Sequence, residues 1–402
     1  MDIPFVAVIA CSAAFTLVSM SIVNIMNIMT TAKKVIVIGR GIAGLACAIT
    51  SAERGHEVIV YYIDGGNSVK ASTGISAAVD AADIPVLRND ILASGKICNT
   101  ELVDVLASDS IQAIQWLEDH GVILKETIQT GGHSVPRTRV TTGAEIVKSL
   151  ESYIQRAGLD ITFRKGVVKT LLKDKNKVVG VEAVANDVVI KEYANGVVMA
   201  TGGYASNVKL HGLPTTNAMY HGGLQIAKKA GAGCVQINQV QIHPTGFVDP
   251  ADPGAHNKIL APEKLRAVGG VLLDANGNRF VNELDTRDVI SDKILSLENK
   301  QACLYLDNLS AERFGPSIGF YISKGLIKKT KDGLYATVTP VVHYTMGGIR
   351  IDKDTRVLGP SGVVRGLFAA GELSGGIHGK NRLCGMSLLD CVVFGIRAGK
   401  YQ

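Results

Sequence analysis

Charged and aromatic residues are both scarce in this chain of 402 residues, at 19% and 5%, and there is a single tryptophan. Low charge and an apolar content of 47% exclude an intrinsically disordered protein. The 44 glycines show no period of three, which excludes a collagen-like chain. Abundant apolar and glycine residues with few aromatics favour an α/β protein with closely packed strands and helices. The length indicates two or three domains.

Concentrated positive charge and metal-ligand spacing are absent as well. The net charge is only +6, from 42 Lys and Arg against 36 Asp and Glu, and no basic tract is interleaved with aromatics. We therefore predict no nucleic-acid partner, whereas an anionic small substrate suits the mild positive charge. The seven cysteines include no C-x-x-C pair, and no histidines lie at metal spacing, so we predict neither a disulfide framework nor a metal site.

The longest stretch without charge lies near the N-terminus. Phe5–Val23 comprises 19 uncharged residues, enough to span a bilayer, and Lys33 and Lys34 follow a weaker apolar stretch. Three interpretations of residues 1–32 remain open: a membrane anchor or uncleaved signal, a signal cleaved near Ala32, and a helix docked on the core. The first two predict a membrane or the secretory pathway, through the endoplasmic reticulum. A mitochondrial transit peptide, which is rich in arginine, fits poorly.

A dinucleotide-binding fingerprint follows directly. Residues 35–38 read Val-Ile-Val-Ile, a buried-strand pattern, and G-x-G-x-x-G follows at Gly39, Gly41 and Gly44. An alanine-rich helix then runs to Arg54, and a second strand occupies residues 57–62. The first glycine permits a tight turn, the second lets the backbone approach a pyrophosphate, and the third lets helix and strand pack closely. The helix N-terminus favours the anion, so this unit predicts a doubly wound α/β domain that binds a dinucleotide.

The second strand lacks the acidic residue that usually binds the adenosine ribose. Tyr62 stands at its expected position, and Asp64 follows two residues later. Either Asp64 takes over the ribose contact or that contact is weakened. Further on, residues 65–75 are a run of glycine and hydroxyl residues, which suits contact with a flat ring system.

Eight segments beyond the fingerprint carry distinctive motifs. They are G-G-N-S-V-K-A-S-T-G-I at 65–75, G-G-H-S at 131–134 with Arg137-Thr138, A-T-G-G at 200–203, H-P-T-G-F at 243–247, R-F-V-N-E-L at 279–284 with T-R-D at 286–288, H-Y-T-M-G-G at 343–348, A-G-E at 370–372 and N-R-L at 381–383. In this order they resemble the soluble fumarate reductases of the FAD-dependent succinate dehydrogenase/fumarate reductase flavoprotein family. The likeness covers Lys33 to the C-terminus.

The resemblance implies a doubly wound, Rossmann-like FAD-binding domain interrupted by a smaller α+β capping domain that closes over the substrate. Carried onto this chain, the FAD-binding domain comprises residues 33–240 and 343–402, and the capping domain comprises residues 241–342. Relative to the family, the cap is short between Cys303 and Thr339. We expect one helix within residues 317–334.

The resemblance also implies an activity, the reduction of fumarate to succinate by hydride transfer from FAD. A small dicarboxylate is then the substrate, and free reduced flavin or a redox partner protein is the electron donor. The positions that match substrate-binding residues are His243, Thr245, His343 and Arg382, and those that match the proton donor and its relay are Arg287, Glu263 and Arg266. Arginine suits a carboxylate because its planar fork pairs bidentately. As an acid it requires Glu263 to return the proton quickly, because an arginine pKa exceeds about 12.

Non-covalent FAD is implied, because no histidine lies where membrane-complex relatives attach flavin. The implied contacts are Gly39, Gly41, Gly44, Asn67, Ser68, Ala71, Ser72, Gly74, Thr201, Gly202, Gly371, Glu372, Ser387 and Leu388. Cys384 and Met386 depart from the family's N-R-L-G-G-[NS]-S, and the family's T-G-D-G is reduced to H-G-G at 221–223. With Tyr62, these departures leave two alternatives open: a reductase of another unsaturated acid, and a non-catalytic, degenerate flavoprotein.

Overall fold

The computed structural model describes residues 32–64, 66–207, 212–217, 222–285 and 287–401. The apolar segment Phe5–Val23, predicted as an anchor, a signal or a docked helix, lies outside these ranges. Within them, none of the helices combines the length and apolar character that crossing a bilayer requires.

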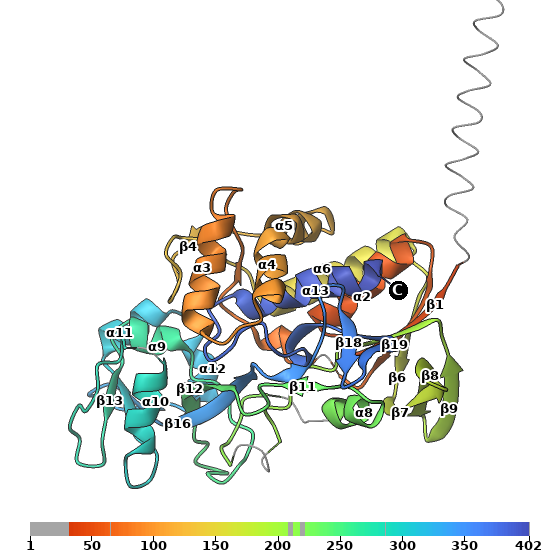
Figure 1. Cartoon of the computed structure of the whole chain (residues 1–402). Coiled ribbons are helices and arrows are strands. Elements are labelled where there is room, and N and C mark those ends of the chain that lie inside the picture. Colours follow the sequence, from red (N-terminus) through yellow and green to blue (C-terminus); the bar gives the residue numbers. More distant parts are fainter. Residues whose placement is uncertain (1–31, 65, 208–211, 218–221, 286, 402) are drawn as a thin grey trace, which may run out of the picture.

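A nine-stranded sheet forms the larger part of the molecule, on the right in Figure 1. Five of its strands are parallel, in the order β6 (Ile161–Lys165), β2 (Glu57–Tyr62), β1 (Lys34–Ile38), β10 (Gly196–Met199) and β19 (Gly362–Ala369). Strands β8 (Lys177–Ala185), β7 (Val167–Asp174), β9 (Val188–Tyr193) and β18 (Arg356–Gly359) extend it, mostly by antiparallel pairing. The Val/Ile runs of β1, β2 and β10 are typical of strands buried on both faces.

Helices cover this sheet and form a second cluster beside it. Helix α2 (Ile42–Glu53) packs along α13 (Met386–Lys400), and α6 (Gly143–Ala157) packs against α2. Helices α3 (Ile84–Gly95), α4 (Thr100–Ser108) and α5 (Ser110–Asp119) lie together beyond α13, at the top of Figure 1. The close contact of α2 with α13 depends on glycine, because a Cβ at Gly395 would lie 2.6 Å from the Ala43 carbonyl oxygen.

The fingerprint glycines adopt the conformations that the sequence predicts. Gly39 has φ +121°, and a Cβ there would lie 2.1 Å from the carbonyl oxygen of Ala200 in the loop after β10. A Cβ at Gly44 would lie 1.9 Å from the Gly39 carbonyl oxygen. A side chain at either position would therefore collide with backbone, which explains why the turn from β1 into α2 needs glycine.

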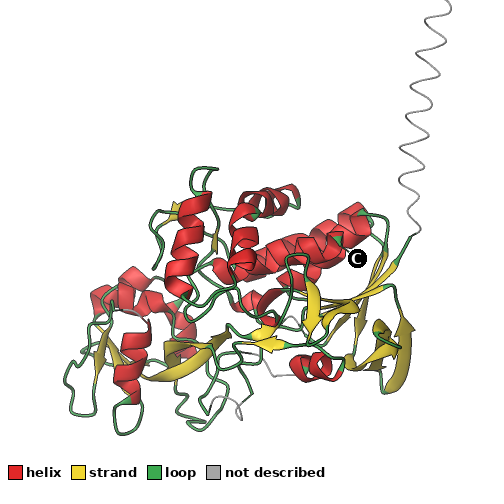
Figure 2. Cartoon of the chain, in the orientation of Figure 1, coloured by secondary structure: helices red, strands yellow, loops and turns green. Residues whose placement is uncertain are grey.

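A second unit has its own hydrophobic core and its own five-stranded sheet. Its strands are β12 (Val240–Phe247), β16 (Leu334–Thr345), β14 (Ala302–Leu306), β13 (Val271–Leu273) and β15 (Lys328–Lys329), all antiparallel. Its helices are α9 (Glu263–Ala267), α10 (Arg287–Leu295), α11 (Asn308–Phe314) and α12 (Ile318–Ser323). Figure 2 shows these helices gathered beside the small sheet, apart from the nine-stranded one. We call residues 240–345 the cap.

Of two expectations about the cap, one is confirmed and one stays a prediction. The helix expected within residues 317–334 is confirmed as α12, of six residues. The division of the chain at 240/241 and 342/343 stays a prediction, and β16 runs across the second of these positions.

The remaining elements are short. They are η1 (Ser68–Lys70), β3 (Ile75–Ser76), β4 (Thr127–Ile128), β5 (Thr138–Arg139), α8 (Gly223–Lys229), β11 (Cys234–Val235), β17 (Gly348–Ile349) and η2 (Gly371–Leu373). The elements η1 and η2 matter most for the site, because the segments that contain them line its main cavity.

Candidate active site

A cavity of about 770 Å³ lies between the nine-stranded sheet and the cap. Its walls include the carboxyl ends of β1, β2 and β10, the turn into α2, and the segments around η1 and η2. From the cap come Leu260, Pro262 and Tyr321. In open α/β sheets, ligands bind beyond the carboxyl ends of the strands, so this cavity is the candidate active site.

Most of the residues expected to contact FAD line this cavity. They are Gly39, Gly41, Asn67, Ser68, Ala71, Ser72, Thr201, Gly202, Gly371, Glu372, Ser387 and Leu388. Gly44 and Gly74 lie behind the wall, where each lets two backbone segments approach. A Cβ at Gly74 would lie 2.3 Å from the Arg139 carbonyl oxygen.

The N-terminus of α2 faces the cavity without a side-chain cap. Gly41 is the N-cap, and the first turn carries no acidic residue. Ser68 Oγ accepts a hydrogen bond from the Ile42 N–H at 3.1 Å, which ties η1 to this turn. Nearby, the Thr201 hydroxyl is buried and has no hydrogen-bond partner among the described residues. Unused donors and a positive helix end suit a pyrophosphate, so the residues present fit a dinucleotide such as FAD.

Tyr62 and Asp64, at the end of β2, both line the cavity. The Tyr62 ring lies under the Arg40 guanidinium, whose carbon is 4.9 Å from the ring centroid, and Arg40 also pairs with Glu151 at 2.7 Å. Asp64 Oδ1 accepts a hydrogen bond from the Gly66 N–H at 3.0 Å. A carboxylate is therefore present at this end of the cavity, two residues after the usual position.

Glu372 is a buried carboxyl group on η2, in the cavity wall. It accepts hydrogen bonds from the Thr345 N–H at 3.0 Å, the Thr345 hydroxyl at 3.2 Å and the Asn217 side chain at 3.4 Å. Burial raises the pKa of Glu372 to about 7. Its carboxyl group therefore exchanges a proton near neutral pH and can either donate or accept a hydrogen bond.

Arg382 is a buried cation in the cavity wall with no carboxylate partner among the described residues. Its Nη1 donates to the Leu383 carbonyl at 2.9 Å, and its guanidinium lies 4.8 Å from the Tyr344 ring centroid. Its Nε is buried and unpartnered. Burial, followed by the charge of Arg287, lowers the pKa of Arg382. A buried charge is costly unless it is paired, and none of the described residues pairs with this guanidinium, so a bound anion would compensate its charge.

Two histidines predicted to bind substrate lie close to each other. His343 lines the cavity, and its ring centroid is 5.7 Å from that of His243, which is buried on β12. Burial, and next the charge of Arg382, lowers the pKa of His343 to about 3. Burial and the charge of Arg287 also hold the pKa of His243 well below its usual value. Both rings are therefore neutral near pH 7 in the free protein, and each has one N–H to donate.

Thr245 lies behind these histidines, in contact with His243. Its N–H donates to His243 Nδ1 at 3.2 Å, and its carbonyl oxygen lies 3.2 Å from the same nitrogen, so this edge of the imidazole faces the Thr245 backbone and Nε2 points away from it. Its hydroxyl donates to the Ala261 carbonyl at 2.9 Å. Thr245 does not line the cavity, and its side chain joins β12 to the segment that leads into α9.

The three residues predicted to move protons lie together, Glu263 and Arg266 on α9 and Arg287 at the N-terminus of α10. Arg287 donates from Nε and Nη2 to Glu263 Oε2, at 3.0 and 2.6 Å. Burial raises the pKa of Glu263, but Arg287 and Arg266 outweigh it, so the net pKa is lowered. Arg266 is buried, with Nε and Nη2 unpartnered, and burial lowers its pKa. None of the three lines the cavity, but the charge of Arg287 acts on the pKa of His243, His343 and Arg382.

Three residues behind Arg382 were not predicted. Tyr344 lines the cavity, and its hydroxyl donates to Asp390 Oδ2 at 3.1 Å. Asp390 is fully buried on α13, and His378 Nε2 lies 3.3 Å from the same oxygen. Asp390 is a single acid within the apolar run of residues 388–393, and that is the signal that indicates a buried polar network.

Comparison with known proteins identifies the family. Residues 34–388 match the family described as FAD binding domain. The chain belongs to this FAD-binding family. It is 36% identical to the fumarate reductase of Schizosaccharomyces pombe, over 92% of this chain and 90% of that one. It is also 34% identical to the L-aspartate oxidase of Pyrococcus abyssi, over 90% and 76% of the two chains.

A solved structure agrees with these relatives. The open conformation of a flavocytochrome c3 fumarate reductase superposes with a TM-score of 0.81 at 28% identity, over 92% of this chain and 78% of that one. The expected family, the Rossmann-like fold and the FAD cofactor are thereby confirmed. This family member is an oxidoreductase that acts on CH–CH groups.

Proposed function

We propose that this protein reduces fumarate to succinate, with Arg382 binding one carboxylate of the substrate and Arg287 supplying the proton. The observation that carries the proposal is the Arg382 guanidinium, buried in the cavity wall without a carboxylate partner in the part of the chain that the structure describes. A dicarboxylate supplies the missing negative charge. The curated relative that is a fumarate reductase supports the same substrate.

Each residue has a distinct task in this reaction. Arg382 pairs with one carboxylate, and His343 donates an N–H to it. His243 donates its Nε2–H towards the second carboxylate. FAD, when bound, supplies a hydride to one alkene carbon. Arg287 donates a proton from its guanidinium to the other, and Glu263, already bonded to Arg287, returns a proton to it. One hydride and one proton added to fumarate give succinate.

The cavity favours fumarate over L-aspartate, the substrate named for another relative. An amino acid brings an ammonium group, which needs an acceptor or a carboxylate beside it. The carboxylates that line the cavity within the described residues are Asp64 and Glu372. Neither suits an ammonium group of the substrate: Asp64 lies at the end of β2, on the dinucleotide side, and the Glu372 carboxyl already accepts hydrogen bonds from Thr345 and Asn217. Glu263 is engaged with Arg287.

The electron donor and the cellular site remain proposals. The sequence has one dinucleotide fingerprint and no haem-attachment motif, so we expect electrons from free reduced flavin or from a redox partner protein. The apolar segment Phe5–Val23 predicts association with a membrane. Fractionation tests it: unprocessed full-length protein found only in the soluble fraction would exclude both the anchor and the cleaved signal.

A substrate panel tests the proposed function. Full-length protein reconstituted with FAD is assayed without oxygen for oxidation of reduced viologen in the presence of fumarate, crotonate or 2-cyclohexenone. We expect turnover with fumarate and little with the other two, because only fumarate offers two carboxylates. Crotonate turnover equal to that of fumarate would indicate another unsaturated acid. A colourless protein that does not retain FAD would support the non-catalytic alternative.

A further inference from the structure

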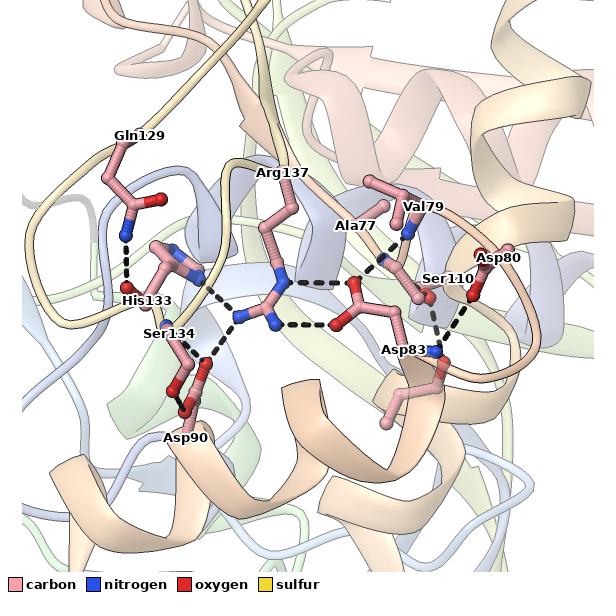
Figure 3. Close-up of polar contacts among 12 residues, drawn as sticks. Ala77, Val79, Asp80, Asp83, Asp90, Ser110, Gln129, His133, Ser134 and Arg137 are labelled. Atoms are coloured by element: carbon pink, nitrogen blue, oxygen red, sulfur yellow. Dashed lines mark hydrogen bonds and ion pairs between the residues drawn. The ribbon is translucent and has the colours of Figure 1, made fainter.

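The G-G-H-S segment at 131–134 does not line the cavity, although the sequence analysis singles it out. It belongs to a buried polar network built around Arg137, shown in Figure 3. The Arg137 side chain is fully buried. Its Nε and Nη2 bind the two carboxylate oxygens of Asp83 at 3.1 and 2.6 Å, and its Nη1 binds Asp90. Both carboxylates come from α3 and the residue that precedes it, so Arg137 has a fixed position and orientation.

Arg137 also determines which nitrogen of His133 carries the proton. Its Nη1 lies 3.1 Å from His133 Nδ1. A guanidinium can only donate, so Nδ1 accepts and the imidazole proton lies on Nε2. Burial, together with the charge of Arg137, lowers the pKa of His133, so the ring is neutral near pH 7. The Nε2–H then donates to the Cys384 carbonyl oxygen at 2.8 Å.

The Cys384 carbonyl lies two residues from Arg382, in the loop that leads into α13. It also accepts from Ser76 Oγ at 2.8 Å. Gly132 lies directly against the same loop, because a Cβ there would be 2.4 Å from Leu383 Cδ2. Arg382 Nη1 donates to the Leu383 carbonyl, so the guanidinium is tied to the peptide next to the one that this network holds.

We propose that His133 is a positioning residue for Arg382. Arg137 holds His133 in its Nε2–H tautomer, and this N–H fixes the Cys384 carbonyl, so that the Arg382 guanidinium is in place before a dicarboxylate arrives. The inference rests on the proposed function, because it assigns Arg382 to the substrate carboxylate. Holding a binding group in place in advance improves both affinity and rate, because less order is lost on binding.

Three variants of His133 test the proposal in the FAD-loaded, full-length protein. His133→Ala removes the donor to Cys384. His133→Gln keeps an N–H near the position of Nε2, whereas His133→Asn has the same amide on a side chain too short to reach it. The matched control is His120→Ala: His120 is also a buried, hydrogen-bonded histidine, but its partners Trp116 and Glu53 lie away from the 381–384 loop.

Two readouts are measured, fumarate kinetics and the affinity for malonate, a non-reacting dicarboxylate, by perturbation of the flavin spectrum. We expect His133→Ala and His133→Asn to weaken malonate binding and to raise the KM for fumarate, each by roughly tenfold. This is the effect expected from the loss of about one hydrogen bond. His133→Gln should recover most of both, and His120→Ala should change neither. The FAD content should stay that of the parent protein in all four.

The outcomes separate this inference from the proposed function. If the parent reduces fumarate and binds malonate, but Gln and Asn at position 133 give the same affinity, the inference is wrong and the proposed function stands. If His133→Ala does not fold, the Gln and Asn pair still decides. A parent protein that neither reduces fumarate nor binds malonate overturns both.

Discussion

The dinucleotide side of the cavity is built mostly from backbone and small side chains, with one buried carboxyl group, Glu372, whereas the proposed substrate side is built from buried charged and imidazole groups. The first side takes its shape from short contiguous segments, such as the turn at Gly39 and Gly41 and the η1 segment at Ser68. The second brings together His343 and Arg382, which are separated in the chain and come from different elements. Steric fit therefore governs the cofactor side, and compensation of buried charge governs the substrate side.

The largest loss of turnover is expected from a change in one side chain on the substrate side. Arg287→Lys keeps the positive charge but loses the planar fork that donates twice to Glu263. Dicarboxylate binding should survive, while turnover falls roughly 10²–10⁴-fold, the usual effect of a positioned proton donor. Steady-state kinetics on FAD-loaded protein measure both. Arg279→Lys is the control, since the exposed Arg279 donates in the same paired way, from Nε and Nη2, to another cap carboxylate, the buried Glu283. A rate within a few-fold of the parent would place the acid elsewhere.

On the cofactor side, stability and FAD content should fall most when a side chain is added at a glycine. Gly39→Ala combines φ +121° with a Cβ 2.1 Å from the Ala200 carbonyl oxygen, so it should destabilise the fold by at least about 1–3 kcal/mol and reduce FAD content. Gly41→Ala meets only the Ser68 hydroxyl, at 3.0 Å, and should fold normally. Thermal unfolding of both variants, with and without FAD, measures this contrast. Equal stability of the two would show that the turn can relax.

Glu372 should give the cofactor side a pH dependence in the FAD-free protein. Its pKa is raised from 4.5 to about 7, so the folded state holds the proton more tightly than the unfolded state. The stabilisation, about 3 kcal/mol at most, is complete below pH 4.5 and is lost as the pH rises through about 7. Denaturant unfolding at pH 5 and pH 8, compared with Glu372→Gln, measures it. The parent should lose more stability than the variant between these pH values, and parallel losses would contradict the shift.

The smallest effect is expected at the end of β2. Tyr62→Glu adds a carboxylate that can accept from the ribose hydroxyls, worth at most about 1.5–3 kcal/mol. Two features reduce the gain: Asp64 already lines the cavity, and Arg40, now over the Tyr62 ring, can pair with the new carboxylate. FAD titration should therefore show tightening of no more than about tenfold. Unchanged or weaker affinity would indicate that Asp64 already serves the ribose.

The cofactor side could be predicted from sequence further than the substrate side, for a physical reason. The glycine spacing at Gly39 and Gly44 encodes a local turn, and strand, turn and helix are neighbours in the chain. The roles of His133 and Asp390 depend on packing between distant segments: His133 reaches a carbonyl 251 positions away. No local pattern encodes such a contact. The resemblance supplied the names of substrate residues, but not the groups that hold them.

Some of the residues predicted for the site lie outside the cavity wall. Thr245 and the group of Arg287, Glu263 and Arg266 lie beside the cavity, not in its wall. Side-chain direction on β12, and the pairing of α9 with α10 through Glu263 and Arg287, decide this placement. Both depend on the tertiary arrangement of the cap.

Reoxidation of the bound cofactor tests the central claim most directly. Full-length protein loaded with FAD is reduced with dithionite without oxygen, freed of excess reductant, and mixed with fumarate while the flavin absorbance is followed. The account predicts that oxidised flavin returns at a rate that depends on fumarate, with one succinate formed for each FAD oxidised, and that Arg382→Lys needs much more fumarate to reach the same rate. Flavin that stays reduced in the presence of fumarate and is oxidised only when air is admitted would contradict it.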